Sequence, residues 1–169
     1  MNAVLAGNLF SALATVTDLA STTFKTTKGM LVMQSVSQGL LGLSSLALGG
    51  YSAVVQNAVS IVRNLTAATQ KAGKALEITL VVLGVVLGIA FNNLQLIGWL
   101  PIIANLEYSV AVFRFKNNER MLKTAFAVCI ILYTVFNIAI KNYVGAVSNV
   151  AVLAATMVAL VKCFKKQSN

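Results

Sequence analysis

Two asparagines stand at equivalent positions in the two halves of this chain. Asn57 and Asn149 are 92 residues apart, and each lies within a long apolar stretch. A carboxamide offers two N–H donors and one acceptor oxygen, so a facing pair can hold a neutral hydroxylated or heterocyclic ligand without burying a charge. The alternative is a structural hydrogen bond between helices. The pair is the first candidate for a binding site, and both interpretations stay open at this point.

Three ionisable residues, Asp18, Arg63 and Glu107, also lie inside apolar stretches. A residue count places them at similar depth, and charges in apolar surroundings are rare and usually paired, so we expect Arg63 to pair with Glu107 or with Asp18. Such an ion pair could act as a gate, and Glu107 could carry a coupled proton. The alternatives are a static structural pair, or an Arg63 side chain that extends to the polar surface.

The chain is poorly supplied with the residues that most enzymes use. It has no histidine, which removes histidine bases, histidine metal ligands and serine–histidine nucleophile pairs. Cys129 and Cys163 are expected at different depths, so we predict neither a disulfide nor a metal site and expect both to be packing residues. An acid pair of Asp18 and Glu107 is disfavoured by the neighbouring Arg63. We predict a protein that is not an enzyme, with no catalytic residue, metal or cofactor.

These side chains are positioned by a sequence that occurs twice. Residues 24–31 read FKTTKGML, and residues 115–122 read FKNNERML, at an offset of 91. After one added residue the match continues at an offset of 92, which relates Tyr51 to Tyr143. A fixed internal period decides the architecture before any local assignment. The period is too long for a solenoid and the unit is almost wholly apolar, which indicates a duplicated membrane unit.

The composition agrees with a membrane protein, because 58% of the 169 residues are hydrophobic and only 10% are charged. A soluble domain of this size would leave large apolar patches exposed. Seven apolar stretches suit the roughly 20-residue span of a bilayer. They cover residues 3–21, 29–47, 51–68, 76–92, 95–113, 122–140 and 143–161. The sequence therefore predicts an all-α protein with seven transmembrane helices.

The basic residues indicate the orientation. The net charge is +9, but no basic face interleaved with aromatic residues is present, so a nucleic-acid partner is not expected. With the N-terminus outside, twelve of the thirteen lysines and arginines lie on the cytoplasmic side and only Lys141 lies outside. This distribution follows the positive-inside rule. We therefore expect an outside N-terminus and a cytoplasmic C-terminus.

The repeat and the helix count together give a 3+1+3 plan. We expect one membrane domain over residues 1–169, with a first three-helix repeat at 1–70, a linker helix at 75–92, a second repeat at 94–162 and a cytoplasmic tail at 163–169. The single linker helix restores the direction of the chain, so the two repeats are parallel. Parallel repeats occur in several transporter folds, in which the substrate binds near the bilayer midplane at the interface between the repeats. The alternative is that duplication only produced a stable bundle.

This layout resembles the SWEET sugar facilitators and the PQ-loop group, which share their plan with the PnuC vitamin carriers. In detail the chain is similar to the YgjV-like family of small bacterial inner-membrane proteins. The similarity spans nearly the whole chain, and it implies a multi-pass protein of the bacterial inner membrane whose activity is unassigned. The motifs that carry it are Gly50-Tyr51-Ser52, Gln56-Asn57, Arg63-Asn64, Gly98-Trp99-Leu100-Pro101 and Asn142-Tyr143-Val144-Gly145.

The resemblance also implies roles for particular residues. In SWEET-like carriers an asparagine from the third helix of each unit lines the central pocket, which matches Asn57 and Asn149. Such carriers use prolines in helices one and five as hinges, and here only Pro101 matches, because Phe10 stands at the other place.

Further substrate-binding candidates are polar or aromatic side chains within the apolar stretches. The alternative for the amides is hydrogen bonding between helices, and for the tryptophan it is a place in the interfacial aromatic belt. These candidates are Gln38, Gln56, Asn105, Trp99 and Tyr108.

We predict from these features a facilitator or secondary carrier of a small neutral polar solute such as a sugar, nucleoside or vitamin. The alternative is a non-transporting membrane receptor or assembly protein built on the same bundle. A pocket at mid-depth lined by Asn57 and Asn149 would favour the carrier, and a dry interface between the repeats would favour the alternative. The expected partners are the lipid bilayer and the solute. The chain holds both repeats, so a monomer could suffice, and a homo-oligomer is also allowed.

Overall fold

The computed structural model describes residues 3–69, 73–115, 117–140 and 142–167. All regular structure within these ranges is helical, and the helices begin and end within a few residues of the predicted stretches. The helices are α1 (Ala3–Thr23), α2 (Thr27–Ala47), α3 (Tyr51–Thr69), α4 (Lys74–Ala90), α5 (Gln95–Arg114), α6 (Glu119–Ala139) and α7 (Tyr143–Gln167). The last helix, α7, continues to Gln167 and so includes most of the predicted tail at 163–169.

Five of these seven helices are long and apolar enough to cross a membrane, namely α1, α2, α5, α6 and the Tyr143–Phe164 part of α7. The helix α4 has only 17 residues. The helix α3 is less apolar because it carries several polar side chains, among them Gln56, Arg63 and Asn64, and these are fully buried within the protein. The polarity of α3 therefore belongs to contacts inside the bundle.

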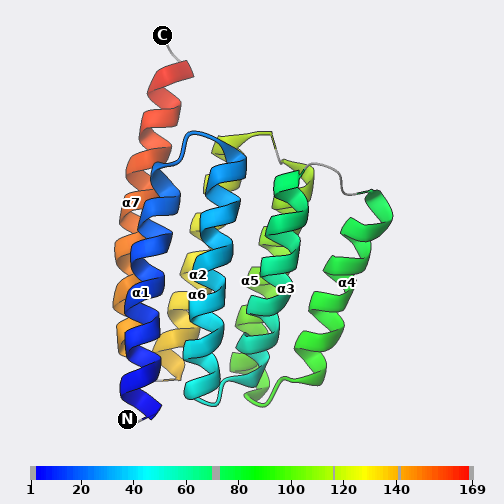
Figure 1. Cartoon of the computed structure of the whole chain (residues 1–169), viewed down its shortest axis with the longest axis vertical. Helices are drawn as coiled ribbons and strands as arrows, with labels where there is room; N and C mark the ends of the chain where they lie inside the picture. The colour runs from blue at the N-terminus through cyan, green and yellow to red at the C-terminus, as the bar shows by residue number, and fades with distance from the viewer. Residues whose placement is uncertain (1–2, 70–72, 116, 141, 168–169) are drawn as a thin grey trace.

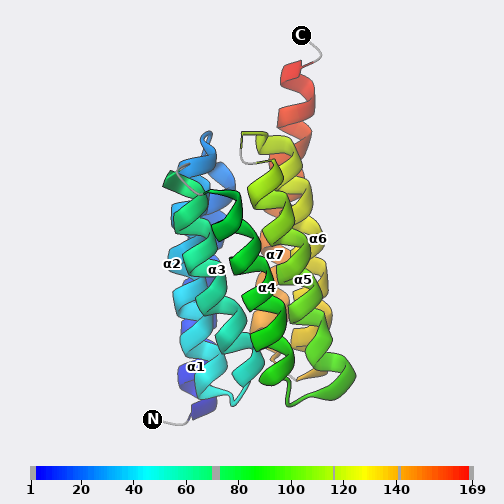
Figure 2. The same cartoon turned by 90° about the vertical axis from the view of Figure 1, so that its right-hand side faces the viewer.

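The helices form two layers, as the two perpendicular views show (Figure 1; Figure 2). In one layer α2 lies between α1 and α3, and in the other α6 lies between α5 and α7. The layers meet where α1 packs on α7 and α3 packs on α5, while α4 covers one edge by packing on α3 and α5.

The two layers are equivalent in their contacts and in their sequence positions. Within the layers, the packed pairs α1–α2 and α2–α3 correspond to α5–α6 and α6–α7. Between the layers, the packed pair α1–α7 corresponds to α5–α3. The helices of the two layers also begin 92 residues apart, at Ala3 and Gln95, at Thr27 and Glu119, and at Tyr51 and Tyr143. The helix boundaries thus follow the repeat found in the sequence to within one residue.

A polar side chain caps the start of the second helix in each layer. The side chain of Thr26 accepts a hydrogen bond from the Gly29 amide at 3.2 Å, and that of Asn118 accepts one from the Met121 amide at 3.1 Å. Both side chains satisfy a backbone donor that the first turn of a helix leaves unpaired. At the opposite end of α2, Gly49 turns the chain into α3 with a φ of +76°, a conformation that favours glycine.

The two ends of the bundle are distinct, and we call them the N-terminal end, where α1 begins, and the C-terminal end, where α7 ends (Figure 1). Most basic residues of the described part lie in the helix termini and connections of the C-terminal end: Lys25, Lys28, Lys74, Arg114, Arg120, Lys123 and Lys162. Other basic residues that entered the orientation argument lie outside the described residues or side chains: Lys71, Lys116, Lys141, Lys165 and Lys166.

Candidate functional site

A small cavity lies between the two layers, and we call it the central cavity. Its volume is about 60 Å³, enough for a few water-sized molecules. Five helices contribute to its wall, and most of the polar groups are hydroxyls and carboxamides. The polar lining residues are Ser11 and Asp18 of α1, Gln38, Ser44 and Ser45 of α2, Asn57 of α3, Tyr133 and Asn137 of α6, Asn142, and Asn149 of α7.

The two equivalent asparagines meet at this cavity. Asn57 is 3% exposed, and Asn149 is half-buried with an Nδ2 donor that has no hydrogen-bond partner. Gln38 lines the same cavity. Three of the predicted substrate-binding residues are thus together, and they come from both layers.

Asp18 introduces an acid into the same wall. Its side chain is 8% exposed and lines the cavity, and one carboxyl oxygen, Oδ1, is buried without a hydrogen-bond partner. The hydroxyl of Ser37 on α2 donates to the carbonyl of Ala14, four residues before Asp18, at 3.2 Å. Nearer the N-terminal end, the hydroxyls of Ser11 and Ser44 join α1 to α2 at 2.8 Å. An acid with an unpartnered oxygen and an asparagine with an unpartnered donor therefore line the same small cavity.

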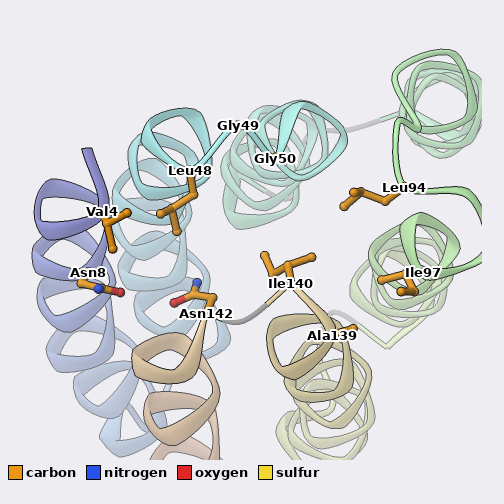
Figure 3. A pocket seen from close by; sticks show the side chains of 10 residues that line it. All are labelled: Val4, Asn8, Leu48, Gly49, Gly50, Leu94, Ile97, Ala139, Ile140 and Asn142. Carbon is orange, nitrogen blue, oxygen red and sulfur yellow. The ribbon is translucent and has the colours of Figure 1, made fainter. Parts of the chain in front are cut away.

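Two larger cavities continue the central cavity toward the ends of the bundle. The N-terminal cavity has a volume of about 330 Å³ and is bounded by Val4 and Asn8 of α1, the turn after α2 and the start of α5 (Figure 3). Asn142 lines both this cavity and the central one. The C-terminal cavity, of about 550 Å³, is bounded by Thr22 of α1 and by residues of α6 and α7.

The three cavities lie in sequence along α1, which contributes Val4 and Asn8 to the first, Ser11 and Asp18 to the second, and Thr22 to the third. Along α6 the order is the same in the opposite chain direction. The cavities therefore follow one line from end to end between the two layers.

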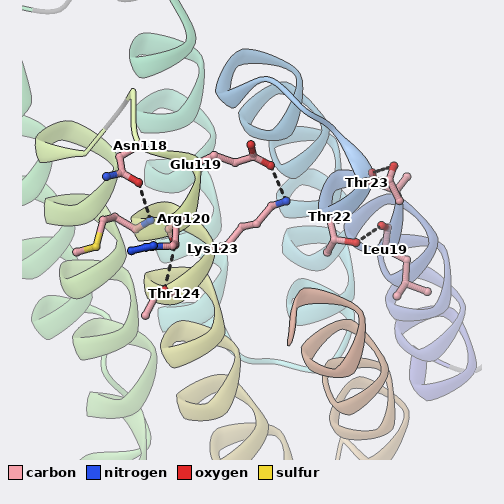
Figure 4. Close-up of polar contacts among 10 residues, drawn as sticks. Leu19, Thr22, Thr23, Asn118, Glu119, Arg120, Lys123 and Thr124 are labelled. Atoms are coloured by element: carbon pink, nitrogen blue, oxygen red, sulfur yellow. Dashed lines mark hydrogen bonds and ion pairs between the residues drawn. The ribbon is translucent and has the colours of Figure 1, made fainter. Parts of the chain in front are cut away.

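The partition between the central and C-terminal cavities is thin. On α6 the central cavity reaches Phe126 and the C-terminal cavity reaches Lys123, less than one helical turn away. Phe126 packs with the buried Leu122 and Val152 in the hydrophobic core. In the wall beyond it, the Lys123 ammonium pairs with the Glu119 carboxylate at 2.6 Å (Figure 4).

A family comparison is decisive for the class of protein. A family model, Imp-YgjV, described as bacterial inner membrane protein, matches residues 5–167. The chain belongs to the Imp-YgjV family. No curated protein and no solved structure matches it. The predicted family is thereby confirmed, and with it a bacterial inner-membrane protein.

Other predicted binding residues of this Imp-YgjV chain belong to a separate cluster where α3 meets α5. Arg63, 1% exposed, donates to the side chains of Asn64 at 3.0 Å, Asn105 and Ser109 at 2.8 Å. Asn105 also accepts from the Ser60 hydroxyl at 2.7 Å and donates to Gln56. We call this group, Gln56, Ser60, Arg63, Asn64, Asn105 and Ser109, the α3–α5 cluster.

The cluster reaches the neighbouring helices as well. Gln56 donates to the Gly84 carbonyl of α4 at 2.8 Å. The Arg63 guanidinium lies 4.8 Å from the ring centroid of Tyr108, whose hydroxyl donates to Gln34 of α2 at 2.6 Å. Gln56, Asn105 and Tyr108 thus take part in helix packing, which was the structural alternative for the amides.

The expected ion pair of Arg63 is not formed among the described residues, because neutral oxygens take its hydrogen bonds and neither Asp18 nor Glu107 is within ion-pair distance. Glu107 is half-buried, with one carboxyl oxygen buried and unpartnered, and it does not line the central cavity. Trp99 is 41% exposed on the outside of the bundle, and Pro101 is buried inside α5.

Sequence reasoning missed several cavity residues. Ser11, Ser44 and Ser45 are small and common in membrane helices, so their type gives no signal. Asn142 belongs to one of the motifs that carry the family resemblance but was not predicted to bind a solute, although its side chain lines two cavities. Its neighbour in space, Asn137, carried the same signal as the predicted amides, since it interrupts an apolar stretch.

Proposed function

We propose that this chain is a membrane carrier of a small polar solute, such as a sugar, nucleoside or vitamin. It works by alternating access between two parallel three-helix repeats and catalyses no reaction. The observation that carries the proposal is the line of three cavities between the layers, with the equivalent asparagines Asn57 and Asn149 at its centre.

The chemistry of the central cavity suits a hydroxyl group. The Asn149 Nδ2 is a buried donor without a partner, and Asp18 Oδ1 is a buried acceptor without a partner. A solute hydroxyl can accept from the first and donate to the second at the same time. Buried polar groups are normally satisfied, so such unpaired atoms at a cavity wall favour an occupant.

The repeat supports alternating access, because a bundle of two equivalent layers can rock about their interface. In this proposal all seven helices cross the membrane. The polar side chains of α3 are shielded by protein, and the 17 residues of α4 span about 26 Å at 1.5 Å per residue, close to the thickness of the hydrocarbon core.

The proposed orientation places the C-terminal end of the bundle in the cytoplasm, since that end carries most of the described basic residues. The C-terminal cavity is then the cytoplasmic entrance, and the layer of Leu122, Phe126 and Val152 is the closed barrier beside it. Pro101 removes one backbone donor from the interior of α5, which makes this the proposed flexible point of the second repeat.

A second candidate is a non-transporting receptor or assembly protein. One observation favours it: the central cavity, at about 60 Å³, is smaller than the roughly 300–1,000 Å³ of typical ligand pockets. A carrier must enlarge this cavity when it takes up its solute, whereas a receptor or assembly protein has no such need.

A thermal-shift screen separates the two candidates. The purified wild type and the Asn57→Ala variant are heated in detergent with sugars, nucleosides, vitamins and amino acids, and Trp99→Ala, on the outside of the bundle, is the control. A ligand at a hundred times its dissociation constant stabilises the folded state by about 2.7 kcal/mol.

For a carrier, a solute raises the melting temperature of the wild type and of Trp99→Ala but not of Asn57→Ala. That solute must then enter proteoliposomes that contain the protein. If no solute stabilises a well-folded wild type, or if the stabilising solute never crosses the membrane, the carrier is excluded and the receptor or assembly role is retained.

A further inference from the structure

The acid in the central cavity, Asp18, has no cationic partner among the residues that the structure describes. The residues of α2, α3 and α7 that line the cavity carry no titratable group, and α6 contributes only Cys129 and Tyr133. Arg63 is held by neutral groups of the α3–α5 cluster. The described lysines nearest to this line, Lys25, Lys123 and Lys162, line the C-terminal cavity instead.

An ionised carboxylate inside a membrane bundle is costly, and such residues are usually paired or take part in ion and proton pathways. Glu107 cannot share the charge of Asp18 favourably, because it is also an acid. Neutralisation of Asp18 must therefore come from a cation that enters the cavity.

We propose that Asp18 is the binding site of a small monovalent inorganic cation, a proton or a sodium ion, and that this cation is coupled to solute binding in the carrier proposed above. The coupling rests on that function, whereas the cation site itself does not.

The ligand set and the size of the cavity fit this occupant. Ser11, Gln38, Ser44 and Asn57 add hydroxyl and carboxamide oxygens to the carboxylate of Asp18, and hard cations prefer oxygen ligands. A volume of about 60 Å³ holds a cation with a few waters. The other proposed occupant, a proton on the Asp18 carboxyl, needs no space beyond that of the side chain.

The repeat predicts one such site in each chain. At the offset of 91, the position equivalent to Asp18 is Ser109 of α5, whose hydroxyl accepts from Arg63. The second layer therefore has a serine in place of the acid, and a single cation binds for each solute.

The test uses the purified full chain without any solute. Melting temperatures are measured in sodium chloride and in choline chloride at equal ionic strength, each at several pH values between about 5 and 8.5. The variants are Asp18→Asn, which keeps the shape of the side chain, and Glu107→Gln as the matched control, a half-buried acid of the same bundle outside the cavity. Infrared spectra report the C=O band of a protonated carboxylic acid.

A sodium site predicts that the wild type and Glu107→Gln melt at temperatures several degrees higher in sodium than in choline, and that Asp18→Asn melts at the same temperature in both. A proton site predicts a pH-dependent carboxylic acid band that Asp18→Asn loses and Glu107→Gln keeps. If Asp18→Asn does not fold, Asp18→Glu replaces it, and the response must return with a changed midpoint.

The proposal is overturned if the wild type shows no sodium response and no carboxylic acid band, or if either signal persists in Asp18→Asn. Its failure is distinct from that of the carrier. A cation response with a blank solute screen refutes only the carrier, and solute binding that is independent of both cations refutes only the coupled cation.

Discussion

The structure divides the buried asparagines into two kinds, and the same substitution at each kind should have different effects. Asn105 uses its side chain three times, as an acceptor for Arg63 and Ser60 and as a donor to Gln56. Asn149 has a donor with no partner. Asn105→Ala and Asn149→Ala remove identical atoms, so the difference between them reports the three hydrogen bonds together with the deeper burial of Asn105, which is 3% exposed.

The expected difference can be worked out from these contacts. Three interhelical hydrogen bonds at the average of about 0.6 kcal/mol measured within membranes give about 2 kcal/mol. The charged partner raises the value, because a hydrogen bond to an ionised group contributes about 1.5–3 kcal/mol and its loss leaves Arg63 undersatisfied. We therefore expect Asn105→Ala to lower the free energy of unfolding by about 2–4 kcal/mol and Asn149→Ala by less than about 0.5 kcal/mol.

The assay is reversible unfolding in mixed micelles of dodecyl maltoside and sodium dodecyl sulfate. Circular dichroism follows the helices, and the fluorescence of Trp99, the single tryptophan, follows α5. A double-mutant cycle of Asn105→Ala with Ser60→Ala should show a coupling of about 0.5 kcal/mol or more, because the two side chains are in direct contact. Equal stabilities of Asn105→Ala and Asn149→Ala would refute the assignment of Asn105 to packing.

Three further predictions concern packing, access and the barrier. Gly88→Ala should destabilise the protein by about 1–3 kcal/mol in the same unfolding assay, because a Cβ would lie 2.9 Å from Ile102 and closer still to Gln56. Gly84→Ala is the control: its Cβ would have no contact under 3.4 Å, so it should be neutral or stabilising by up to about 1 kcal/mol. If the C-terminal end is cytoplasmic, a maleimide should label Cys163 in inverted vesicles but not in spheroplasts. Equal labelling from both sides contradicts the orientation. Lys123→Met should change stability by no more than about 1 kcal/mol, because methionine fills the buried site of Lys123 and the Glu119 side chain, 33% exposed, stays in contact with solvent. The same variant should speed maleimide labelling of Cys129 from the cytoplasmic side, and unchanged labelling would exclude the Lys123–Glu119 pair from the barrier.

The order and limits of the helices were predictable from the sequence because the bilayer imposes a length, and because the repeat fixed equivalent positions. The depth of a residue in the bilayer did not predict which neighbouring helix its side chain faces. Gln56 and Asn57 are neighbours in the chain, yet successive side chains point about 100° apart on a helix. Gln56 therefore turns to α4 and α5, while Asn57 turns to the central cavity.

The same geometry explains why the expected ion pair failed. Arg63 faces the side of α5 that carries Asn105 and Ser109, four residues apart and on one face. Glu107, two residues from each, points to another side. A residue count gives the depth of a side chain but not its direction.

The two interfaces that the repeat makes equivalent carry different chemistry. Between α3 and α5, Arg63 bonds to Ser109, and further amides join the same cluster. At the offsets of 92 and 91, the corresponding positions between α7 and α1 are Ala155 and Asp18. One interface is thus held by hydrogen bonds, and its counterpart has a small apolar side chain and an acid with a free oxygen.

This difference assigns the direction of motion in the proposed carrier. A rocking bundle needs one contact between its layers to persist while the other parts. The α3–α5 contact is the one stabilised by the cluster and covered by α4, so it persists. The α1–α7 contact has no such network among the described residues, and α1 lines all three cavities. Opening on the α1–α7 side would widen the space around Asp18 and Asn149, the two unpartnered groups that a solute or a cation must reach.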